Sequence, residues 1–323
     1  MLNRRLSIAP MLDWTDRYFR YFARLITRHT LLYTEMITTA ALLHGDPDRF
    51  LAFDPQEHPL ALQLGGNDPA DLAACSRMGQ EWGYDEINLN LGCPSNRVQS
   101  GQFGACLMAE PGLVANLIKA MTDAVTLPVT VKHRTGIDDM DSYPHLCDFV
   151  GTLFDAGCRT FIVHARPAWL LGLSPQQNRD IPPLNYDRAY QLKKDFPGAE
   201  IVINGGIKSL TDAERHLERV DGVMIGREAY RNPWILIDAD RRIFNDSHPL
   251  PTRHEIIDQL LPFIATEIGK GVPLSRIARH AMGLFHGQPG ARGWRRHLSE
   301  NGCKPGADGS VMLAAAENTR HFV

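Results

Sequence analysis

One cysteine stands in a segment whose residue types could support proton transfer. Residues 89–104 read LNLGCPSNRVQSGQFG, a glycine-rich stretch that places Cys93 directly before Pro94. Proline fixes its own φ and restricts the preceding residue to extended conformations, so Cys93 is held in a narrow range of positions. A thiol held in this way can donate a proton as a general acid. A buried structural role is the alternative for a lone cysteine, and a strand-end loop does not favour it.

Polar residues also stand at the ends of most short apolar runs in the first 230 residues. They are Gln63, Asn88, Asn90, Lys132, Arg134, His164, Arg166, Asn204 and Arg227. One such residue could be a buried group with an internal partner. A polar residue at nearly every strand end instead indicates a binding site, because each buried polar group needs a hydrogen-bond partner.

Two glycine-containing turns indicate a phosphate site. Gly205 and Gly206 follow Asn204, and Gly226 precedes Arg227. Glycine lets backbone N–H groups approach an anion closely, and an arginine can add a charge-assisted contact. The alternative is that both turns need glycine only for their geometry. We interpret the two turns together as the site of a phosphate-bearing cofactor or substrate.

Eight short apolar runs, each a strand by length and composition, carry these residues. They begin at Leu6, Leu31, Leu60, Glu86, Pro128, Thr160, Glu200 and Gly222. Segments with helical spacing, such as 69–82 and 111–125, separate most of them. Strand and helix alternating eight times predicts a (β/α)8 TIM barrel, whose active site forms at the C-terminal ends of the strands. The rival, a doubly wound open sheet, would need a G-x-G-x-x-G turn that the sequence lacks.

After residue 226 the alternation gives way to helical segments alone. Residues 253–269, 274–285 and 291–298 have helical spacing and are separated by glycine and proline. We therefore predict a barrel at residues 1–247 and a small all-helical domain at 252–301. The tail at 302–323 is rich in glycine and alanine, and we expect it to be poorly ordered.

Charge is distributed unevenly in the helical part. The chain carries 34 Lys and Arg against 37 Asp and Glu, yet residues 268–299 contain no acidic residue. Arg292, Arg295 and Arg296 have i, i+3, i+4 spacing and share one helix face, whereas Trp294 points towards the core. A positive block in an acidic protein predicts a phosphate-binding surface, with a solvated charged face as the alternative.

The composition bounds the remaining classes. With 44% hydrophobic and 22% charged residues, the chain is typical of a globular protein. No cysteine pair has the spacing of a zinc ribbon, a redox dithiol or a disulfide scaffold, so we expect reduced thiols, no metal site and a cytoplasmic protein. No apolar run is long enough for a bilayer, and the N-terminus has no secretory h-region. We expect a monomer without a protein partner.

Several motifs, in this order, resemble those of the tRNA-dihydrouridine synthases. They are APM at 9–11, QLG at 63–65, NLNLGCP at 88–94, KHRTG at 132–136, HAR at 164–166, NGG at 204–206 and GR at 226–227. Further segments resemble the bacterial A-type branch, namely LYTEM at 32–36, GLSP at 172–175, NRDIPPL at 178–184 and GAR at 290–292. The cysteine loop is highly specific, whereas NGG and GR would also fit other FMN barrels.

The resemblance implies an FMN enzyme that reduces uridine to 5,6-dihydrouridine in the tRNA D-loop, at U20 and U20a. NADPH would reduce the flavin, which would pass hydride to C6 of uracil while Cys93 protonates C5. The residues implied to contact FMN are Pro10, Met11, Leu12, Gln63, Lys132, His164, Arg166, Asn204, Gly205, Gly206, Gly226 and Arg227. Those implied to contact tRNA are Asn90, Arg134, Gln176, Arg179, Arg292, Arg295 and Arg296.

Two other functions stay open from the sequence. A small-molecule FMN oxidoreductase of the dihydroorotate or dihydropyrimidine dehydrogenase type explains the barrel and the phosphate site but not the acid-free basic helices. A non-catalytic RNA-binding module is excluded if the purified protein has a flavin spectrum. Salt-sensitive tRNA binding separates the other two functions. The preference for NADPH over NADH also stays open.

Overall fold

A computed structural model describes residues 2–320. Eight parallel strands pair in the order β1-β8-β7-β6-β5-β4-β3-β2, and the bridge between Ser7 and Leu31 joins β1 to the start of β2. The strands are β1 (Leu6–Ile8), β2 (Leu32–Thr38), β3 (Leu60–Gly65), β4 (Glu86–Leu91), β5 (Val129–Arg134), β6 (Thr160–His164), β7 (Glu200–Asn204) and β8 (Gly222–Ile225). The predicted (β/α)8 barrel is confirmed.

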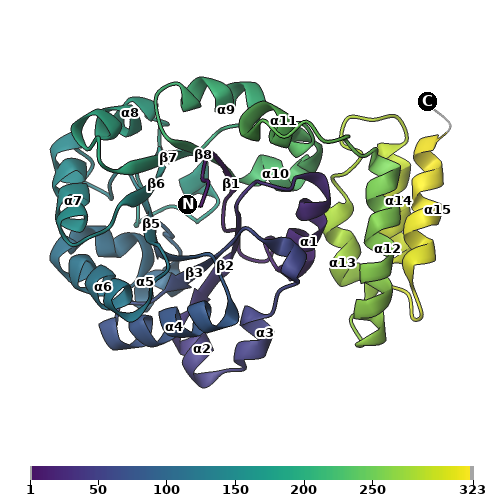
Figure 1. The fold of residues 1–323 in the computed structure, drawn as a ribbon, viewed down its shortest axis with the longest axis horizontal. Helices are drawn as coiled ribbons and strands as arrows, with labels where there is room; N and C mark the ends of the chain where they lie inside the picture. Colours follow the sequence, from purple (N-terminus) through teal and green to yellow (C-terminus); the bar gives the residue numbers. More distant parts are fainter. Residues whose placement is uncertain (1, 321–323) are drawn as a thin grey trace.

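Helices surround this ring of strands (Figure 1). The longer ones are α1 (Arg17–Ile26), α4 (Pro69–Trp82), α6 (Pro111–Ala124), α7 (Tyr143–Asp155), α8 (Tyr186–Asp195) and α9 (Leu210–Leu217). Short α-helices are α2 (Thr39–His44), α3 (Pro47–Leu51), α5 (Asn96–Ser100), α10 (Arg227–Arg231) and α11 (Ala239–Phe244). The 3-10 turns are η1 (Pro55–Glu57), η2 (Gly104–Ala109), η3 (Gln177–Arg179) and η4 (Pro233–Leu236).

Helix α4 shows why the sequence forms these elements. The Asp68 side chain accepts a hydrogen bond from the backbone N–H of Asp71, Pro69 stands in the first turn, and Gly83 ends the helix with φ 91°. Each feature satisfies or replaces a backbone group that an unaided helix end leaves unpaired. The predicted helix at 69–82 is confirmed with the same bounds.

Two apolar cores are separated by the strands. Outward-facing side chains such as Leu60, Leu62 and Leu64 pack against the helices. A smaller cluster fills the barrel interior and consists of Ala9, Leu31, Tyr33, Ala61, Ile162, Val202 and Met224. Because side chains alternate along a strand, Gln63 faces the same way as Ala61, into the barrel. Side chains therefore fill the barrel interior, and a ligand can reach the strands only at the ends of the barrel.

Four helices follow the barrel, and α13 lies next to α1, with α14 and α15 further from the barrel (Figure 1). They are α12 (Arg253–Gly269), α13 (Leu274–Ala281), α14 (Ala291–Asn301) and α15 (Gly309–Arg320). Trp294 is fully buried and its indole N–H donates to the carbonyl of Ala281 at 3.2 Å, as the predicted core position requires. The carboxylate of Asp16, which caps the N-terminus of α1, accepts from Arg279 at 2.8 Å and lies 3.0 Å from His280 of α13, so it links the barrel to the helical part.

The tail differs from the expectation. Residues 309–320 form α15, and Met312, Ala315 and Ala316 are buried, so the prediction of poor order for 302–323 is wrong there. The end of α15 instead packs closely against the start of α14. A Cβ at Gly290 would lie 2.0 Å from the carbonyl oxygen of Asn318. Residues 321–323 lie outside the described residues, and the domain boundary at 247–252 stays a prediction.

No helix within residues 2–320 combines the length and the apolar character that a bilayer-spanning segment requires. In the same part of the chain, no three His, Cys, Asp or Glu side chains are grouped as a metal ion would need.

Candidate active site at the barrel mouth

A continuous line of buried polar side chains rises through the barrel to the cysteine loop. We call the five residues Glu86, Thr130, Asn88, Gln63 and Asn90 the polar ladder. The Thr130 hydroxyl donates to Glu86 at 2.6 Å, and the Asn88 amide donates to Thr130 at 2.8 Å. Gln63 then donates to Asn88 at 2.8 Å, and Asn90 donates to Gln63 at 2.8 Å. Each rung therefore fixes which way the next side-chain amide points.

The top rung of the ladder positions the cysteine loop. The Asn90 side-chain oxygen accepts from the backbone N–H groups of Gly92 at 3.1 Å and Cys93 at 3.0 Å. The Cys93 carbonyl accepts from Ala105 at 3.0 Å, which closes the loop on itself. A Cβ at Gly104, where φ is 76°, would lie 2.7 Å from that carbonyl. Cys93 is half-buried, with its thiol 3.6 Å from the Ser95 hydroxyl, so the sulfur is held but accessible.

Lys132 brings a cation to the same mouth. Its ammonium donates to the side-chain oxygen of Asn204 at 3.2 Å, across from β5 to β7. Burial, and then the charge of Arg134, lowers the pKa of Lys132 to about 7. The pKa of His164 is also lowered well below its usual range, by burial and by the Arg134 and Lys132 charges. A positive potential of this kind attracts an anion.

The turn at Gly205 and Gly206 has the backbone geometry of an anion cradle, whereas Gly226 has an ordinary φ of -97°. Gly205 has φ 118° and Gly206 has φ 70°, values that residues with a Cβ rarely adopt. A Cβ at Gly205 would lie 2.9 Å from the His164 ring, and one at Gly206 would lie 2.6 Å from Leu184. The cradle thus sits directly beside His164, and Lys132 bonds the residue that precedes it. These donors and charges fit a phosphate-bearing group.

Arg227 stands next to the cradle, although its present partner is a carboxylate. It is the first residue of α10, and its guanidinium pairs with Asp180 at 2.6 Å. This pair holds the pKa of Asp180 below its usual range. Arg166 donates to the carbonyls of Asp180 and Pro182 in the same loop. Both arginines therefore lie at the barrel mouth, and the Asp180 carboxylate fixes the position of the Arg227 side chain.

Arg134 turns away from solvent, and its contact with tRNA, implied by the family resemblance, stays a prediction. It is 2% exposed, and its N–H groups donate to the carbonyls of Gly92 at 3.1 Å, Pro167 at 3.0 Å and Asn178 at 2.8 Å. Arginine provides a rigid fork of donors that can join several carbonyls at once. Arg134 thus links the cysteine loop to the loop that follows β6.

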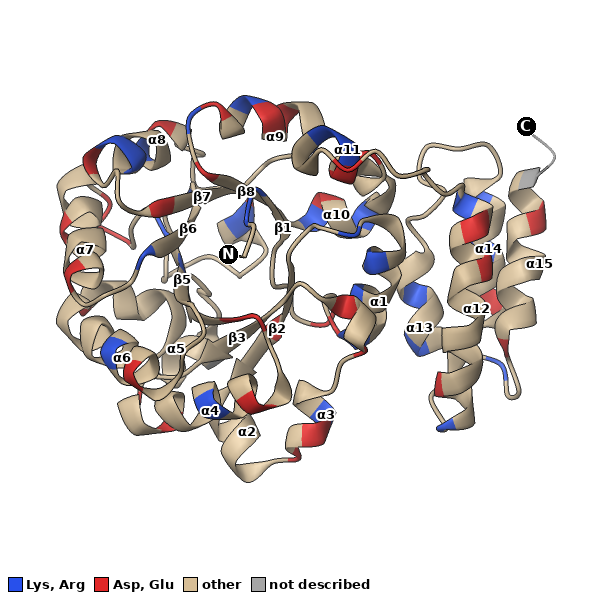
Figure 2. Ribbon diagram, viewed as in Figure 1, with Lys and Arg blue, Asp and Glu red and all other residues tan. Residues whose placement is uncertain are grey.

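The remaining predicted residues fall into three places. Pro10, Met11 and Leu12 follow β1, where the Met11 N–H donates to Thr15 at 3.0 Å and Leu12 is 68% exposed. Gln176 and Arg179 are exposed in the loop after β6. Arg292, Arg295 and Arg296 are exposed on α14, well apart along the chain from the mouth residues. Helix α13 nearby carries only basic charges (Figure 2).

The sequence did not identify two members of the polar ladder, Glu86 and Thr130. It also did not identify the roles of Asn178 and Asp180 in holding the loop after β6. Glu86, Asn88 and Asn90 alternate along β4, so their spacing could have placed Glu86 inside the barrel. Thr130 has the same relation to Lys132 on β5. Asn178 and Asp180 entered the sequence analysis only within the motif at 178–184, and the partner of Asp180, Arg227, lies 47 residues further along the chain.

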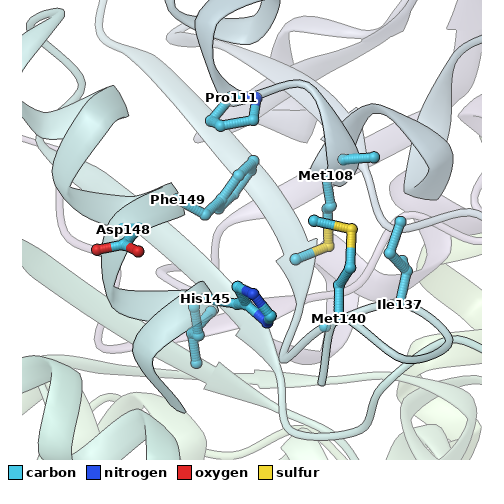
Figure 3. A pocket seen from close by; sticks show the side chains of 10 residues that line it. Met108, Pro111, Ile137, Met140, His145, Asp148 and Phe149 are labelled. Atoms are coloured by element: carbon cyan, nitrogen blue, oxygen red, sulfur yellow. The ribbon is translucent and has the colours of Figure 1, made fainter. Parts of the chain in front are cut away.

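One cavity lies away from these residues (Figure 3). It has a volume of about 230 Å³ and is lined mainly by apolar side chains between α6 and α7, among them Met108, Met140 and Phe149. It contains none of the predicted site residues. The candidate active site is therefore assigned from its polar and charged side chains and not from the position of this cavity.

Comparison with known proteins assigns the family. Residues 7–319 match the model of the dihydrouridine synthase (Dus) family. The chain belongs to this family. A tRNA-dihydrouridine(20/20a) synthase of Vibrio parahaemolyticus is 59% identical over 312 residues, 96% of this chain and 95% of that protein. The enzyme of the same description from Escherichia coli K12 is 59% identical over 309 residues, 95% of this chain and 89% of that protein.

Among solved structures, a 2-naphthoyl-CoA reductase complex has a TM-score of 0.56 at 10% identity, covering 73% of this chain and 49% of that one. At this identity the likeness supports the barrel fold alone. Dihydrouridine synthases are flavin-dependent oxidoreductases. The positively charged groups at the barrel mouth agree with a cofactor that carries a phosphate.

Proposed function

We propose that this protein reduces uridine to 5,6-dihydrouridine at positions 20 and 20a of tRNA, with FMN as the flavin and NADPH as the reductant. The observation that carries the proposal is a thiol held at the barrel mouth by Asn90, near a half-buried lysine and a glycine cradle. With tRNA as the substrate, the reaction belongs in the cytoplasm.

The residues around the mouth suit distinct tasks. FMN would be held by the cradle at Gly205 and Gly206, by Arg227, and by Lys132 at its electron-rich edge. When bound, it supplies a hydride to C6 of the uracil. Cys93 donates a proton to C5, and the ladder keeps its loop in place during that step. Asn90 has a second amide hydrogen with which to hold the uracil.

A direct test combines a spectrum with a product assay. The purified protein should be yellow, with a flavin absorption that NADPH bleaches under anaerobic conditions. Incubation with unmodified tRNA should then yield dihydrouridine, detected by mass spectrometry of the digested nucleosides. A colourless protein, or a bleached flavin that leaves tRNA unchanged while reducing a free pyrimidine base, would contradict the proposal.

Arg227→Ala should weaken flavin retention. Loss of one charge-assisted phosphate interaction costs about 1.5–3 kcal/mol, which corresponds to roughly 10- to 100-fold in affinity. Flavin occupancy after dialysis measures the effect, with Arg215→Ala on α9, whose side chain is 75% exposed, as the matched control. Asp180→Asn breaks the same ion pair but keeps the arginine. If Asp180→Asn lowered occupancy equally, the effect would belong to the loop and not to a phosphate contact.

Replacing Arg292, Arg295 and Arg296 together by alanine should weaken tRNA binding. The salt slope of log K should flatten by up to about one unit for each arginine that binds a phosphate in the wild type. A titration at several salt concentrations measures this, while flavin content and its reduction by NADPH should stay as in the wild type. The control replaces three exposed cations on the barrel wall, Lys119, Lys194 and Arg215. Equal slopes for both triple variants would show that tRNA docks on another surface.

A further inference from the structure

Large apolar side chains are exposed around the barrel mouth. Leu171 is 84% exposed, Ile181 51% and Trp169 36%, and all three belong to the loop between β6 and α8. Leu12, 68% exposed, lies in the turn after β1, at the same end of the barrel. Exposed leucines are common singly, but a group of apolar side chains at one mouth indicates a surface that something covers.

The loop is held on both sides of Leu171, since the Asn178 amide also donates to the Leu173 carbonyl at 3.4 Å. The buried Asn178 side chain accepts from the Trp169 N–H at 2.8 Å and donates to the Trp169 carbonyl at 2.8 Å. The Leu170 N–H donates to Asp138 at 2.7 Å. Gly172 follows Leu171 with φ 82° and turns the chain back. The exposure of Leu171 is therefore built into a fixed turn, and little ordering entropy is lost when a partner binds.

Hydrogen bonds place this turn beside the cysteine loop. The Gln99 side-chain amide donates to the Pro94 carbonyl at 2.9 Å and to the Leu170 carbonyl at 3.2 Å. Arg134 also links Gly92 to Pro167 and Asn178. Leu171 thus follows a residue that is tied directly to the segment carrying Cys93.

Arginines in the same loop and at the same end of the barrel indicate that the partner is an anion. Arg179 is exposed eight residues further along the chain, and Arg166 and Arg227 lie on the same side of the barrel. An apolar tip on a loop that also carries arginines, at the end of the barrel where Arg227 lies, fits a polyanion with flat apolar faces between its charges. Unstacked bases of a nucleic acid have this chemistry, because each base has a face for stacking and each phosphate a charge.

We propose that Leu171 enters the base stack of the tRNA beside the target uridine, in the place that the uridine leaves. This inference rests on the proposed function, since a uridine that reaches Cys93 must first leave its stack. An aliphatic wedge between neighbouring bases offsets the free energy of unstacking. Leu171 acts on the neighbours of the reacting base and is a positioning residue.

The test uses the full-length holoenzyme and tRNA carrying 2-aminopurine next to the target uridine. Wild-type binding should raise the 2-aminopurine fluorescence, because the neighbouring base loses its stacking partner. Leu171→Ala should remove most of that rise and lower kcat/KM for tRNA about tenfold, a change of about 1.4 kcal/mol. Leu171→Met, which keeps an apolar side chain of similar size, should restore both. Flavin content and flavin reduction by NADPH should be the same in all variants.

Leu313→Ala is the matched control, because Leu313 is an exposed leucine on α15, 37% accessible and outside the mouth. A fluorescence rise and a kcat/KM in Leu171→Ala equal to those of the wild type would overturn the inference. So would a loss of activity with an unchanged fluorescence rise, since that pattern assigns Leu171 to another step. If the wild type itself formed no dihydrouridine, the proposed function would fail, which is a separate outcome.

Discussion

Cys93→Ala should lower the rate of dihydrouridine formation by about 10²- to 10⁴-fold, the usual contribution of a positioned general acid. The protein should still fold and keep its flavin, because the Cys93 backbone, not its sulfur, makes the bonds to Asn90 and Ala105. Reduction of the flavin by NADPH should continue at the wild-type rate, since that step needs no proton from the thiol. Rapid-mixing absorbance and single-turnover tRNA assays separate the two half-reactions.

Cys106→Ala provides the control within the same segment. Cys106 is half-buried, its thiol contacts the Phe103 carbonyl at 3.1 Å, and burial raises the pKa of that thiol. Its removal should leave both half-reactions close to the wild type. Turnover of tRNA by Cys93→Ala at the wild-type rate would show that another group protonates C5.

Lys132→Met should slow flavin reduction by about 10²- to 10³-fold, the range found when one preorganised electrostatic contact is removed. The ammonium is the charge that would stabilise a reduced, anionic flavin, and methionine fills a similar space without it. Stopped-flow reduction by NADPH measures the change, with Lys119→Met on α6 as the control for an exposed lysine. Reduction at the wild-type rate would remove Lys132 from the cofactor site.

The same substitution should stabilise the protein prepared without flavin. Burial and the Arg134 charge lower the pKa of Lys132 from 10.5 to about 7, so the unfolded chain binds the proton more tightly. Lys132 therefore lowers the free energy of unfolding. This destabilisation is complete below pH 7 and becomes smaller as the pH rises towards 10.5. Lys132→Met should therefore raise Tm most near pH 6 and least near pH 10. Equal melting temperatures at pH 6 would contradict the lowered pKa.

The sequence predicted the barrel well because its signals are local. Strand runs alternate with helical segments, and the structure confirms α4 at residues 69–82 and α12 at residues 253–269 with the bounds expected. The burial of Trp294 followed from helical spacing in the same way. Polar residues at the strand ends lie at one end of the barrel, because parallel strands in a barrel end on one face. Their role in binding stays a prediction.

Long-range contacts account for what the sequence did not reveal. Lys132 and Arg134 share one side of β5, yet only Arg134 turns under the neighbouring loops, which depends on carbonyls up to 44 residues away. Helix α15 forms because Gly290 and Gly293 let Asn318 approach α14 closely, a complementarity that neither segment shows alone. The pairing of Arg227 with Asp180 likewise joins two loops 47 residues apart.

The polar ladder limits how this protein can evolve. Asn88 and Gln63 use both ends of their amides on ladder neighbours, and Thr130 both donates and accepts within it. Replacing Gln63, Asn88 or Thr130 leaves two buried neighbours each short of a hydrogen bond, a penalty that no single compensating replacement removes. These positions should therefore vary together among descendants of this chain or not at all. A library that randomises them one at a time would recover only the parent residue, whereas a library that varies neighbouring rungs jointly could find new solutions.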